Sequence, residues 1–247
     1  MDTTVHEIAD GIYRVSTVLP AANLPFNQYL ILAEEPMLFH AGHRQLFGPV
    51  SEAVARVIPV RRLRWLTFGH VEADECGAMN RWLQAAPDCQ VVHGATGVLV
   101  SLNDLADRPP RMIGDGETMD LGGKRIRWIN TAHVPHGWDA GLICEEATST
   151  LFAGDLFTAQ GPAAASTDAD IVGPAIEAEN AFHFTAITPS TGPVIRTLAD
   201  LDPSALALMH GPAFTGAAAG ALRSLADYYD DLLRQQLTER DDQTWVP

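Results

Sequence analysis

Short apolar runs separated by turn residues recur along the whole chain, and this pattern limits the fold more than any other feature of the sequence. Runs that are continuous or alternate in polarity predict strands, and longer segments with apolar positions at helical spacing predict helices. The predicted strands are 11–16, 29–33, 37–39, 63–68, 124–130, 141–144, 150–153 and 205–209, with a turn at 34–36. The predicted helices are 45–57, 77–85 and 216–238. Short strands interleaved with helices favour a layered α/β or α+β fold.

The length of 247 residues suits one large domain, because a chain of this size buries a substantial core without needing disulfide bonds or structural metal ions. Residues 160–170 are small, polar and proline-containing, which is typical of a mobile surface loop. They do not resemble a linker that leads to a second core. We therefore expect a single domain over residues 1–240, followed by a polar tail over residues 241–247.

Acidic residues outnumber basic ones by 31 to 16, which gives a formal net charge of -15. Such a surface repels phosphate backbones and argues against nucleic-acid binding. The N-terminus lacks the pattern of a signal peptide, and no apolar run approaches the roughly 18 residues that span a bilayer. Cys76, Cys89 and Cys144 follow no C-x-x-C spacing, which favours free thiols in a reducing compartment. These features predict a soluble cytoplasmic protein.

The strongest local signal is the segment Gly69-His-Val-Glu-Ala-Asp-Glu-Cys-Gly77, between a predicted strand and a predicted helix. His70, Glu72 and Asp74 alternate, so an extended loop would place their side chains on one face. Imidazole and carboxylate groups are ligands that iron, manganese and zinc accept. A plainer explanation also exists. Asp74 would cap the following helix, Glu75 would favour the positive end of its dipole, and His70 would be an ordinary loop residue.

Three further segments place an acid or a histidine at a strand end. The turn Ala132-His133-Val-Pro-His136 carries two histidines, and Asp155 and His210 each follow a short apolar strand. Strand ends are where a sheet positions a site rigidly. Each position alone has a plainer reading, since an aspartate after a strand is often a turn former. Together with the first segment, however, they favour a metal site.

The order His-x-Glu-x-Asp, then histidine, aspartate and histidine, resembles the metallo-β-lactamase superfamily. It is most similar to the flavodiiron and oxygen-binding di-iron branch, because Glu72 replaces the second histidine of the more common His-x-His-x-Asp-His motif. Eighteen residues (137–154) separate His136 from Asp155, which is the branch's interval and selects His136 over His133 as the ligand. The segments 27–31 and His210-Gly211 also resemble the branch. The resemblance implies an α+β fold, a four-layer αββα sandwich.

The resemblance also implies a ligand set for two metal ions. The first metal would take His70, Glu72 and His136, the second would take Asp74 and His210, and Asp155 would bridge them. The branch usually has a histidine where this chain has Glu75, so either Glu75 or water would complete the second metal, or Glu75 would face solvent. Relatives usually carry an aspartate at the position of His40. His40 and His133 would then hydrogen-bond to ligands and orient them, or each would be an ordinary partly buried histidine.

The three carboxylates Glu72, Asp74 and Asp155 suit hard ions, which favours two iron ions, with manganese or zinc as alternatives. The resemblance implies a non-haem di-iron protein that binds dioxygen or nitric oxide, for sensing or for reduction with a separate electron-donor protein. No phosphate-binding glycine-rich loop is apparent. We therefore expect no FMN within this chain and no flavodoxin domain.

A metal-dependent hydrolase of the same superfamily is the alternative function. Two metal ions about 3.5 to 4 Å apart would activate a hydroxide that attacks an ester, thioester, lactone or phosphoester, and Asp74 would be the catalytic proton acceptor. The sequence offers no evident basic clamp for a phosphorylated substrate, because Arg108 and Arg111 are only loosely placed. A degenerate scaffold without metal is the third reading. The sequence leaves the substrate, the electron donor and the oligomeric state open.

Overall fold

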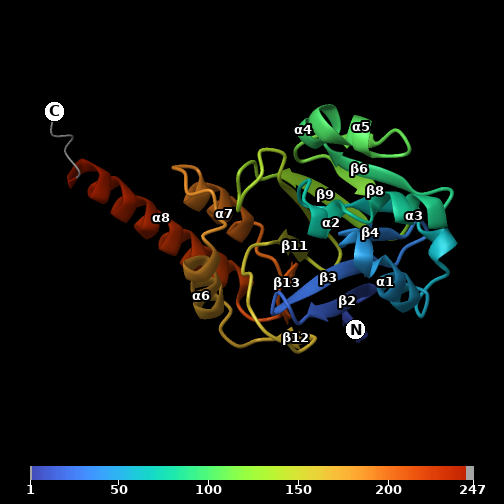
Figure 1. Cartoon of the computed structure of the whole chain (residues 1–247), viewed down its shortest axis with the longest axis horizontal. Coiled ribbons are helices and arrows are strands. Elements are labelled where there is room, and N and C mark those ends of the chain that lie inside the picture. The colour runs from blue at the N-terminus through green and yellow to red at the C-terminus, as the bar shows by residue number, and fades with distance from the viewer. Residues whose placement is uncertain (1, 243–247) are drawn as a thin grey trace.

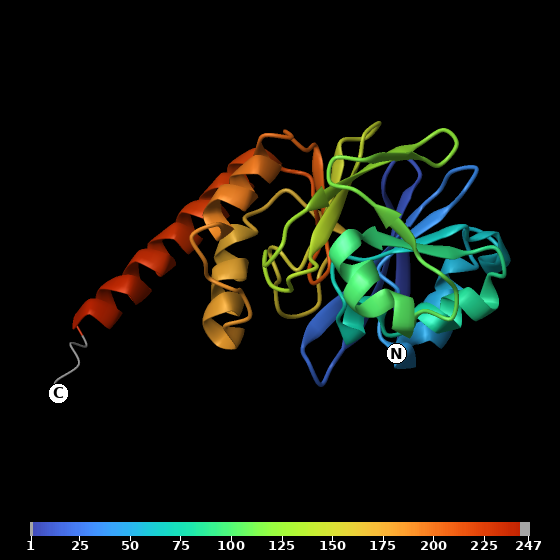
Figure 2. The same ribbon diagram turned by 90° about the horizontal axis from the view of Figure 1, so that it is seen from above.

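Two β-sheets pack face to face, and helices cover the outer face of each sheet (Figures 1 and 2). The computed structural model describes residues 2–242. Its layers follow the order helix, sheet, sheet, helix, which confirms the predicted α+β fold and the four-layer αββα sandwich. α8 runs outward from this body along the long axis of the molecule (Figure 1).

The first sheet has the strand order β1-β2-β3-β4-β5-β6-β7. Its strands are β1 (Thr3–Ala9), β2 (Ile12–Leu19), β3 (Leu24–Ile31), β4 (Met37–Phe39), β5 (Trp65–Thr67), β6 (Gln90–Gly94) and β7 (Arg111–Ile113). β1 to β4 pair antiparallel, whereas β4 to β7 pair parallel. The parallel strands β4, β5 and β6 therefore end at the same edge of the sheet, where the segment after β5 begins.

The second sheet has the strand order β12-β14-β13-β11-β10-β9-β8. Its strands are β8 (Thr118–Asp120), β9 (Arg125–Asn130), β10 (Gly141–Glu145), β11 (Thr150–Gly154), β12 (Ser166–Thr167), β13 (Ala205–Leu208) and β14 (Ala213–Phe214). β11 and β13 are parallel neighbours, so the segments that follow them leave the sheet at the same edge.

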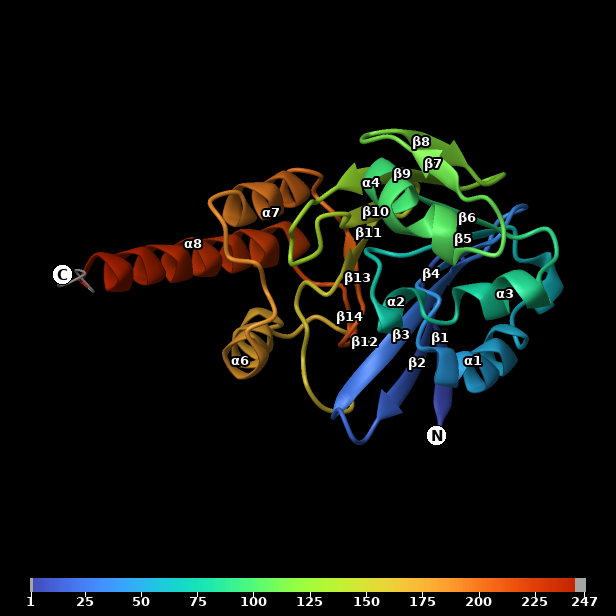
Figure 3. The ribbon, with the colours of Figure 1, turned by 45° about the horizontal axis from the view of Figure 1, so that its top comes forward.

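The helices lie on both sides of the paired sheets, with α1 and α3 beside the first sheet and α7 and α8 beside the second (Figure 3). In chain order they are η1 (Arg44–Leu46), α1 (Phe47–Val54), η2 (Val60–Arg62), α2 (Ala73–Cys76), α3 (Met79–Ala85), α4 (Ala95–Gly97), η3 (Val98–Leu102), α5 (Asn103–Leu105), α6 (Val172–Phe182), α7 (Thr191–Ala199) and α8 (Ala218–Asp242). Among the helices of residues 2–242, none combines the length and apolar character that a membrane span requires.

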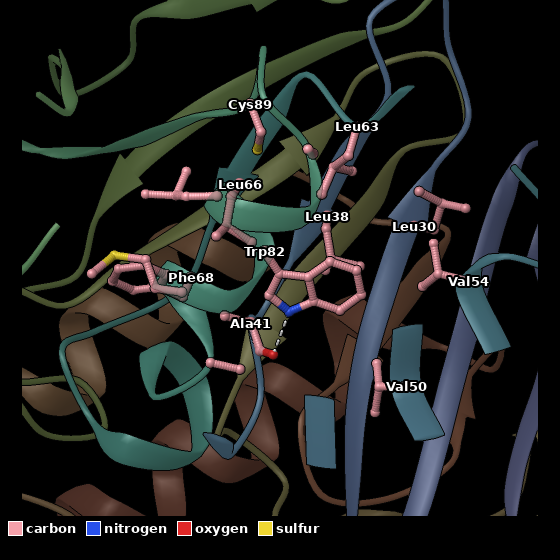
Figure 4. Close-up of a cluster of buried hydrophobic side chains, with 14 of the residues drawn as sticks. Leu30, Leu38, Ala41, Val50, Val54, Leu63, Leu66, Phe68, Trp82 and Cys89 are labelled. Atoms are coloured by element: carbon pink, nitrogen blue, oxygen red, sulfur yellow. Dashed lines mark hydrogen bonds between the residues drawn. The ribbon is translucent and has the colours of Figure 1, made fainter. Parts of the chain in front are cut away.

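Alternate residues of the central strands belong to different hydrophobic cores. Tyr29 and Met37 pack between the two sheets, whereas their neighbours Leu30 and Leu38 pack between the first sheet and its helices. Because both faces of these strands are buried, their sequences are apolar throughout rather than alternating. In the helix-facing core, Trp82 of α3 packs among leucine and valine side chains, and its indole N–H donates to the carbonyl oxygen of Ala41 at 2.9 Å (Figure 4).

Most predicted elements are present, with shifted ends. The predicted helix 45–57 is η1 followed by α1, and the predicted helix 77–85 is α3. Within the predicted loop 160–170, Ser166 and Thr167 form β12, which pairs with β14. The sequence pattern did not predict the strands β1, β6, β7, β8 and β14, nor the helices η2, α2, α4, η3, α5, α6 and α7. The predicted C-terminal helix continues to Asp242, and the rest of the predicted tail lies outside the described residues.

Candidate metal centre

Five loop or helix-start segments bring the predicted ligands together. His70 and Glu72 follow β5, and Asp74 lies in the first turn of the short helix α2. The other three predicted ligands come from the β9–β10 loop (His136) and from the residues directly after β11 (Asp155) and close after β13 (His210). Asp74 is therefore helical rather than part of an extended loop. It is also no helix cap, because the N-cap residue of α2 is Glu72.

The first donor group consists of His70, Glu72, His136 and Asp155, whose ligand atoms all lie within 4.8 Å of one another. Glu72 Oε2 lies 2.7 Å from His70 Nε2 and 3.0 Å from His136 Nε2. Asp155 Oδ2 lies 3.5 Å from His136 Nε2 and 3.9 Å from His70 Nε2. Two imidazole nitrogens and two carboxylates thus converge on one point.

The second donor group consists of Asp74, Asp155 and His210. His210 Nε2 lies 3.3 Å from Asp74 Oδ2 and 3.4 Å from Asp155 Oδ1. The two oxygens of Asp155 are thus divided between the groups, with Oδ2 toward the first and Oδ1 toward the second. A carboxylate placed in this way is suited to bridge two metal ions.

The carboxylates of the two donor groups favour positive charge on the neighbouring histidines. Burial disfavours the charged form of His70, but the carboxylates of Glu75 and Glu72 outweigh burial and raise the pKa of His70 to about 12. Burial likewise opposes charge on His210, but the nearby carboxylates of Asp155 and Asp74 outweigh burial and raise the pKa of His210 to about 10. Asp155 Oδ1 is buried and has no hydrogen-bond partner among the described residues. Divalent metal ions satisfy such a set of mixed nitrogen and oxygen donors, so the residues fit a metal centre.

His210 is held by buried polar residues of the first sheet. Asn27 Nδ2 donates to the carbonyl oxygens of Leu208 at 2.7 Å and Gly211 at 2.8 Å, one on each side of His210. The Tyr29 hydroxyl also donates to the Leu208 carbonyl, and the Arg14 guanidinium donates to the Gly211 carbonyl. These donors fix the main chain around the histidine.

The loop that carries His70 is held by Asp139, the last residue of the segment His136-Gly-Trp-Asp139. Asp139 Oδ2 accepts a hydrogen bond of 2.9 Å from the main-chain N–H of Val71. Gly137 lies against the His70 side chain at a positive φ of 80°, and a Cβ at this position would come within 3.3 Å of His70. A glycine between His136 and Asp139 therefore lets the two loops approach closely.

Glu75, His40 and His133 take three different positions. Glu75 is fully buried and faces His40 and His70 rather than solvent. His40 is also fully buried. His133 is exposed rather than partly buried, and within residues 2–242 no hydrogen bond joins its side chain to a ligand candidate. The spacing argument that selected His136 over His133 agrees with the geometry, because His136 lies in the first donor group.

The two donor groups open onto a pocket of about 220 Å³. Besides the ligand candidates, its lining residues are Leu24, Thr158, Phe182 and Phe184. The Phe184 ring lies edge-on to His136, with 5.9 Å between the ring centroids. The Thr158 hydroxyl is directed to the main-chain oxygen of Asp155 at 2.7 Å. The pocket therefore offers a mostly apolar wall beside the donors.

The fold and the donors agree with a known family. The model of a family described as "ODP family beta lactamase" matches residues 24–211, which include every predicted ligand. This chain belongs to that family. The rubredoxin-oxygen oxidoreductase of Megalodesulfovibrio gigas is 24% identical to this ODP-family chain over 232 residues, covering 85% of the chain and 57% of the relative. The chain thus spans little more than half the length of that relative.

Solved structures share the fold of this ODP-family chain. The metal-soaked Flv1 flavodiiron core from Synechocystis sp. PCC6803 has a TM-score of 0.76 at 19% identity, covering 96% of this chain and 62% of that one. A fragment (1–254) of the putative diflavin flavoprotein A 5 from Nostoc sp. PCC 7120 has a TM-score of 0.76 at 17% identity, covering 97% and 98%. These structures confirm the fold, and the family match over residues 24–211 together with the similarity to the rubredoxin-oxygen oxidoreductase confirms the resemblance to the flavodiiron branch of the metallo-β-lactamase superfamily.

Several residues around the donors were not singled out from the sequence. They are Arg14, which holds the His210 segment, and Leu24, Phe182 and Phe184, which line the pocket. A signal existed only for Arg14, a charged residue inside an otherwise apolar strand. The pocket residues come from β3 and from the end of α6 and its following loop, and no motif marks them.

Proposed function

We propose that this chain is a non-haem di-iron protein that binds dioxygen or nitric oxide, for sensing or for reduction with electrons from a separate donor protein. The observation that carries the proposal is the division of the Asp155 carboxylate between two donor groups. Each donor group combines imidazole and carboxylate ligands, and the two groups share the Asp155 carboxylate. This arrangement supports a site for two metal ions.

The composition of the donors supports iron over zinc. Glu72, Asp74 and Asp155 supply three carboxylates, and His70, His136 and His210 supply three imidazoles. Carboxylate oxygens suit harder ions, and their negative charge stabilises the ferric state. Two iron ions held by these residues would bind a diatomic ligand and exchange electrons with it.

The pocket supports a small neutral ligand. Its side chains other than the ligand candidates are three apolar groups and one hydroxyl, so it offers no cationic side chain to hold an anionic substrate. Leu24, Phe182 and Phe184 give part of the site an apolar lining. Dioxygen and nitric oxide need no further polar recognition, whereas a phosphoester or a carboxylate-bearing lactone would.

Metal analysis combined with anaerobic optical spectroscopy tests the proposal. We expect about two iron per purified chain, and a change in visible absorption when the reduced, anaerobic protein meets dioxygen. An Asp155→Asn variant is the matched control, because it changes the bridging carboxylate and little else. It should lose the optical response.

The hydrolase alternative predicts the opposite pattern. A chain that is purified with zinc, cleaves esters or lactones, and shows no optical change with dioxygen would contradict the di-iron proposal. In that outcome Asp74, which lies 3.3 Å from His210 Nε2, would be the first candidate for the proton acceptor. Its replacement by asparagine should then abolish hydrolysis.

A further inference from the structure

The two positions at which this chain departs from its branch lie next to each other in space. The branch usually carries an aspartate at the position of His40 and a histidine at the position of Glu75. Here the acid and the imidazole are exchanged, and Glu75 Oε1 lies 3.3 Å from His40 Nε2, with both side chains fully buried. The exchange keeps one acid and one imidazole in contact.

His40 is held from several sides. Its Nδ1 lies 3.2 Å from the carbonyl oxygen of Asn27, on the side of the ring away from Glu75. Its main-chain N–H donates to the Thr67 carbonyl at 2.8 Å. Its φ of 67° lies in the left-handed region, which a residue other than glycine keeps only where its surroundings impose it. The Nε2 atom is thereby directed at Glu75.

Glu75 connects His40 to His70. Its Oε2 accepts a hydrogen bond of 2.8 Å from the main-chain N–H of His70, and its Oε1 lies 3.4 Å from His70 Nδ1. A Cβ at Gly69 would come within 3.0 Å of Glu75 Oε2, so glycine there permits the close approach. Since Nδ1 of His70 faces Glu75, its Nε2 is left to face Glu72 and Asp155.

We propose that Glu75 is a positioning residue, which His40 holds and which fixes the main chain and ring of His70 so that Nε2 faces the first metal. Glu75 is then not a ligand of the second metal. The second donor group keeps three protein residues against four in the first, so the second metal would retain a position for an exogenous ligand. The inference rests on the proposed metal site, but not on the reaction of that site with dioxygen.

Cobalt binding tests the positioning role without iron chemistry. Co²⁺ is titrated into the full chain in an Asp74→Asn background, which leaves the first donor group complete, and its affinity is measured by competition with a chelator. Glu75→Gln and His40→Asn are then added singly and together. We expect each single change to weaken Co²⁺ binding about 10- to 100-fold, as is typical when a partner of a ligating histidine is removed.

The double variant separates positioning from other roles. The two residues form one unit if Glu75 acts through its contact with His40. The double variant should then bind Co²⁺ no less tightly than whichever single variant has the lower affinity. Additive losses, or wild-type affinity in Glu75→Gln, would overturn the inference. Loss of only the second Co²⁺ equivalent when Glu75→Gln is placed in the chain with Asp74 intact would also overturn it, because that loss marks Glu75 as a ligand of the second metal.

A control variant and a fallback ensure that the cobalt experiment can be interpreted. Glu145→Gln removes another fully buried carboxylate, at the far end of β10, and should leave Co²⁺ affinity unchanged. If Glu75→Gln does not fold, His40→Asn alone tests the proposal, since an unchanged Co²⁺ affinity in that variant refutes the positioning role. If cobalt binding behaves as expected but the iron-loaded chain ignores dioxygen, the proposed function fails and this inference stands.

Discussion

His210 Nδ1 lies 2.9 Å from the main-chain carbonyl oxygen of Pro25, at the start of β3. A carbonyl oxygen only accepts, so the contact places a proton on Nδ1 and leaves Nε2 free to coordinate. Nε2 is the atom that faces Asp74 and Asp155. The first sheet thus determines which nitrogen of a histidine from the second sheet serves the site.

Asn27→Leu should weaken this link between the sheets. The change removes the amide donor to the carbonyls of Leu208 and Gly211 while keeping the side-chain volume similar. Each carbonyl keeps one donor, from Tyr29 or from Arg14, so we expect a loss of about 1 to 3 kcal/mol in the free energy of unfolding. Urea unfolding measures this loss, and metal titration should show weaker binding of the second equivalent.

Gln28→Leu is the matched control for Asn27→Leu. Gln28 is the next residue, is fully buried, and its amide atoms have no hydrogen-bond partner among the described residues. Replacing an unsatisfied buried amide with an apolar group of similar size costs little or stabilises the protein. If both variants lose the second metal equally, the hydrogen bonds to Leu208 and Gly211 are not what positions His210.

Glu72→His should reverse the metal preference of the first donor group. The change replaces a hard oxygen donor between His70 and His136 with a third imidazole, which suits zinc better than ferric iron. We expect the ratio of bound iron to bound zinc to reverse when both metals are offered together. Elemental analysis of the purified variant measures this ratio. Iron loading equal to that of the unchanged chain would contradict the charge argument for iron.

The ligand candidates could be named from the sequence, and they lie together in the two donor groups, because each belongs to a short motif next to a strand. His70 and Glu72 follow β5, and Asp155 and His210 follow strands of the second sheet, so local pattern and site coincide. The contact of His40 with Glu75 could not be predicted from local sequence motifs. It depends on the parallel pairing of β4 with β5 and on the left-handed backbone of His40, and neither leaves a local signal.

The missed elements have physical reasons as well. β1 (Thr3–Ala9) is an edge strand, and its exposed residues Thr4, His6 and Glu7 are polar, so its sequence lacks the apolar run of a buried strand. α6 contains Gly173 and Pro174 in its first turn, which resembles a loop until the structure places the proline where its missing N–H does no harm. α7 begins in the same way with Gly192 and Pro193.

Glu145→Gln should lower stability in a pH-dependent way. Burial alone would raise the pKa of Glu145, but hydrogen bonds from the Thr148 hydroxyl and from the amides of Ala147 and Thr148 lower it below its ordinary value of 4.5. A lowered folded-state pKa contributes stability above the unfolded-state pKa, and this contribution disappears as pH falls through the folded-state value. We expect a cost of about 1.5 to 3 kcal/mol at pH 7.

The pH series provides the check on the Glu145 prediction. Urea unfolding of both chains at pH 7, 5 and 4 should show a constant difference down to pH 5 and a smaller one at lower pH. Glu146→Gln is the neighbouring control, because Glu146 makes partly exposed ion pairs with Arg125 and Arg127, and their loss should cost about 1 kcal/mol or less. A difference that grows on acidification would show that Glu145 is protonated in the folded chain.

Asp155→Asn and Asp74→Asn should differ in the number of metal ions they lose. Asp155 faces both donor groups, whereas Asp74 faces only His210 in the second. We therefore expect Asp74→Asn to retain one tightly bound metal ion and Asp155→Asn to weaken both, since an amide oxygen carries no charge to share between two cations. Elemental analysis after dialysis against a mild chelator counts the retained ions. Equal retention in the two variants would contradict the bridging role of Asp155.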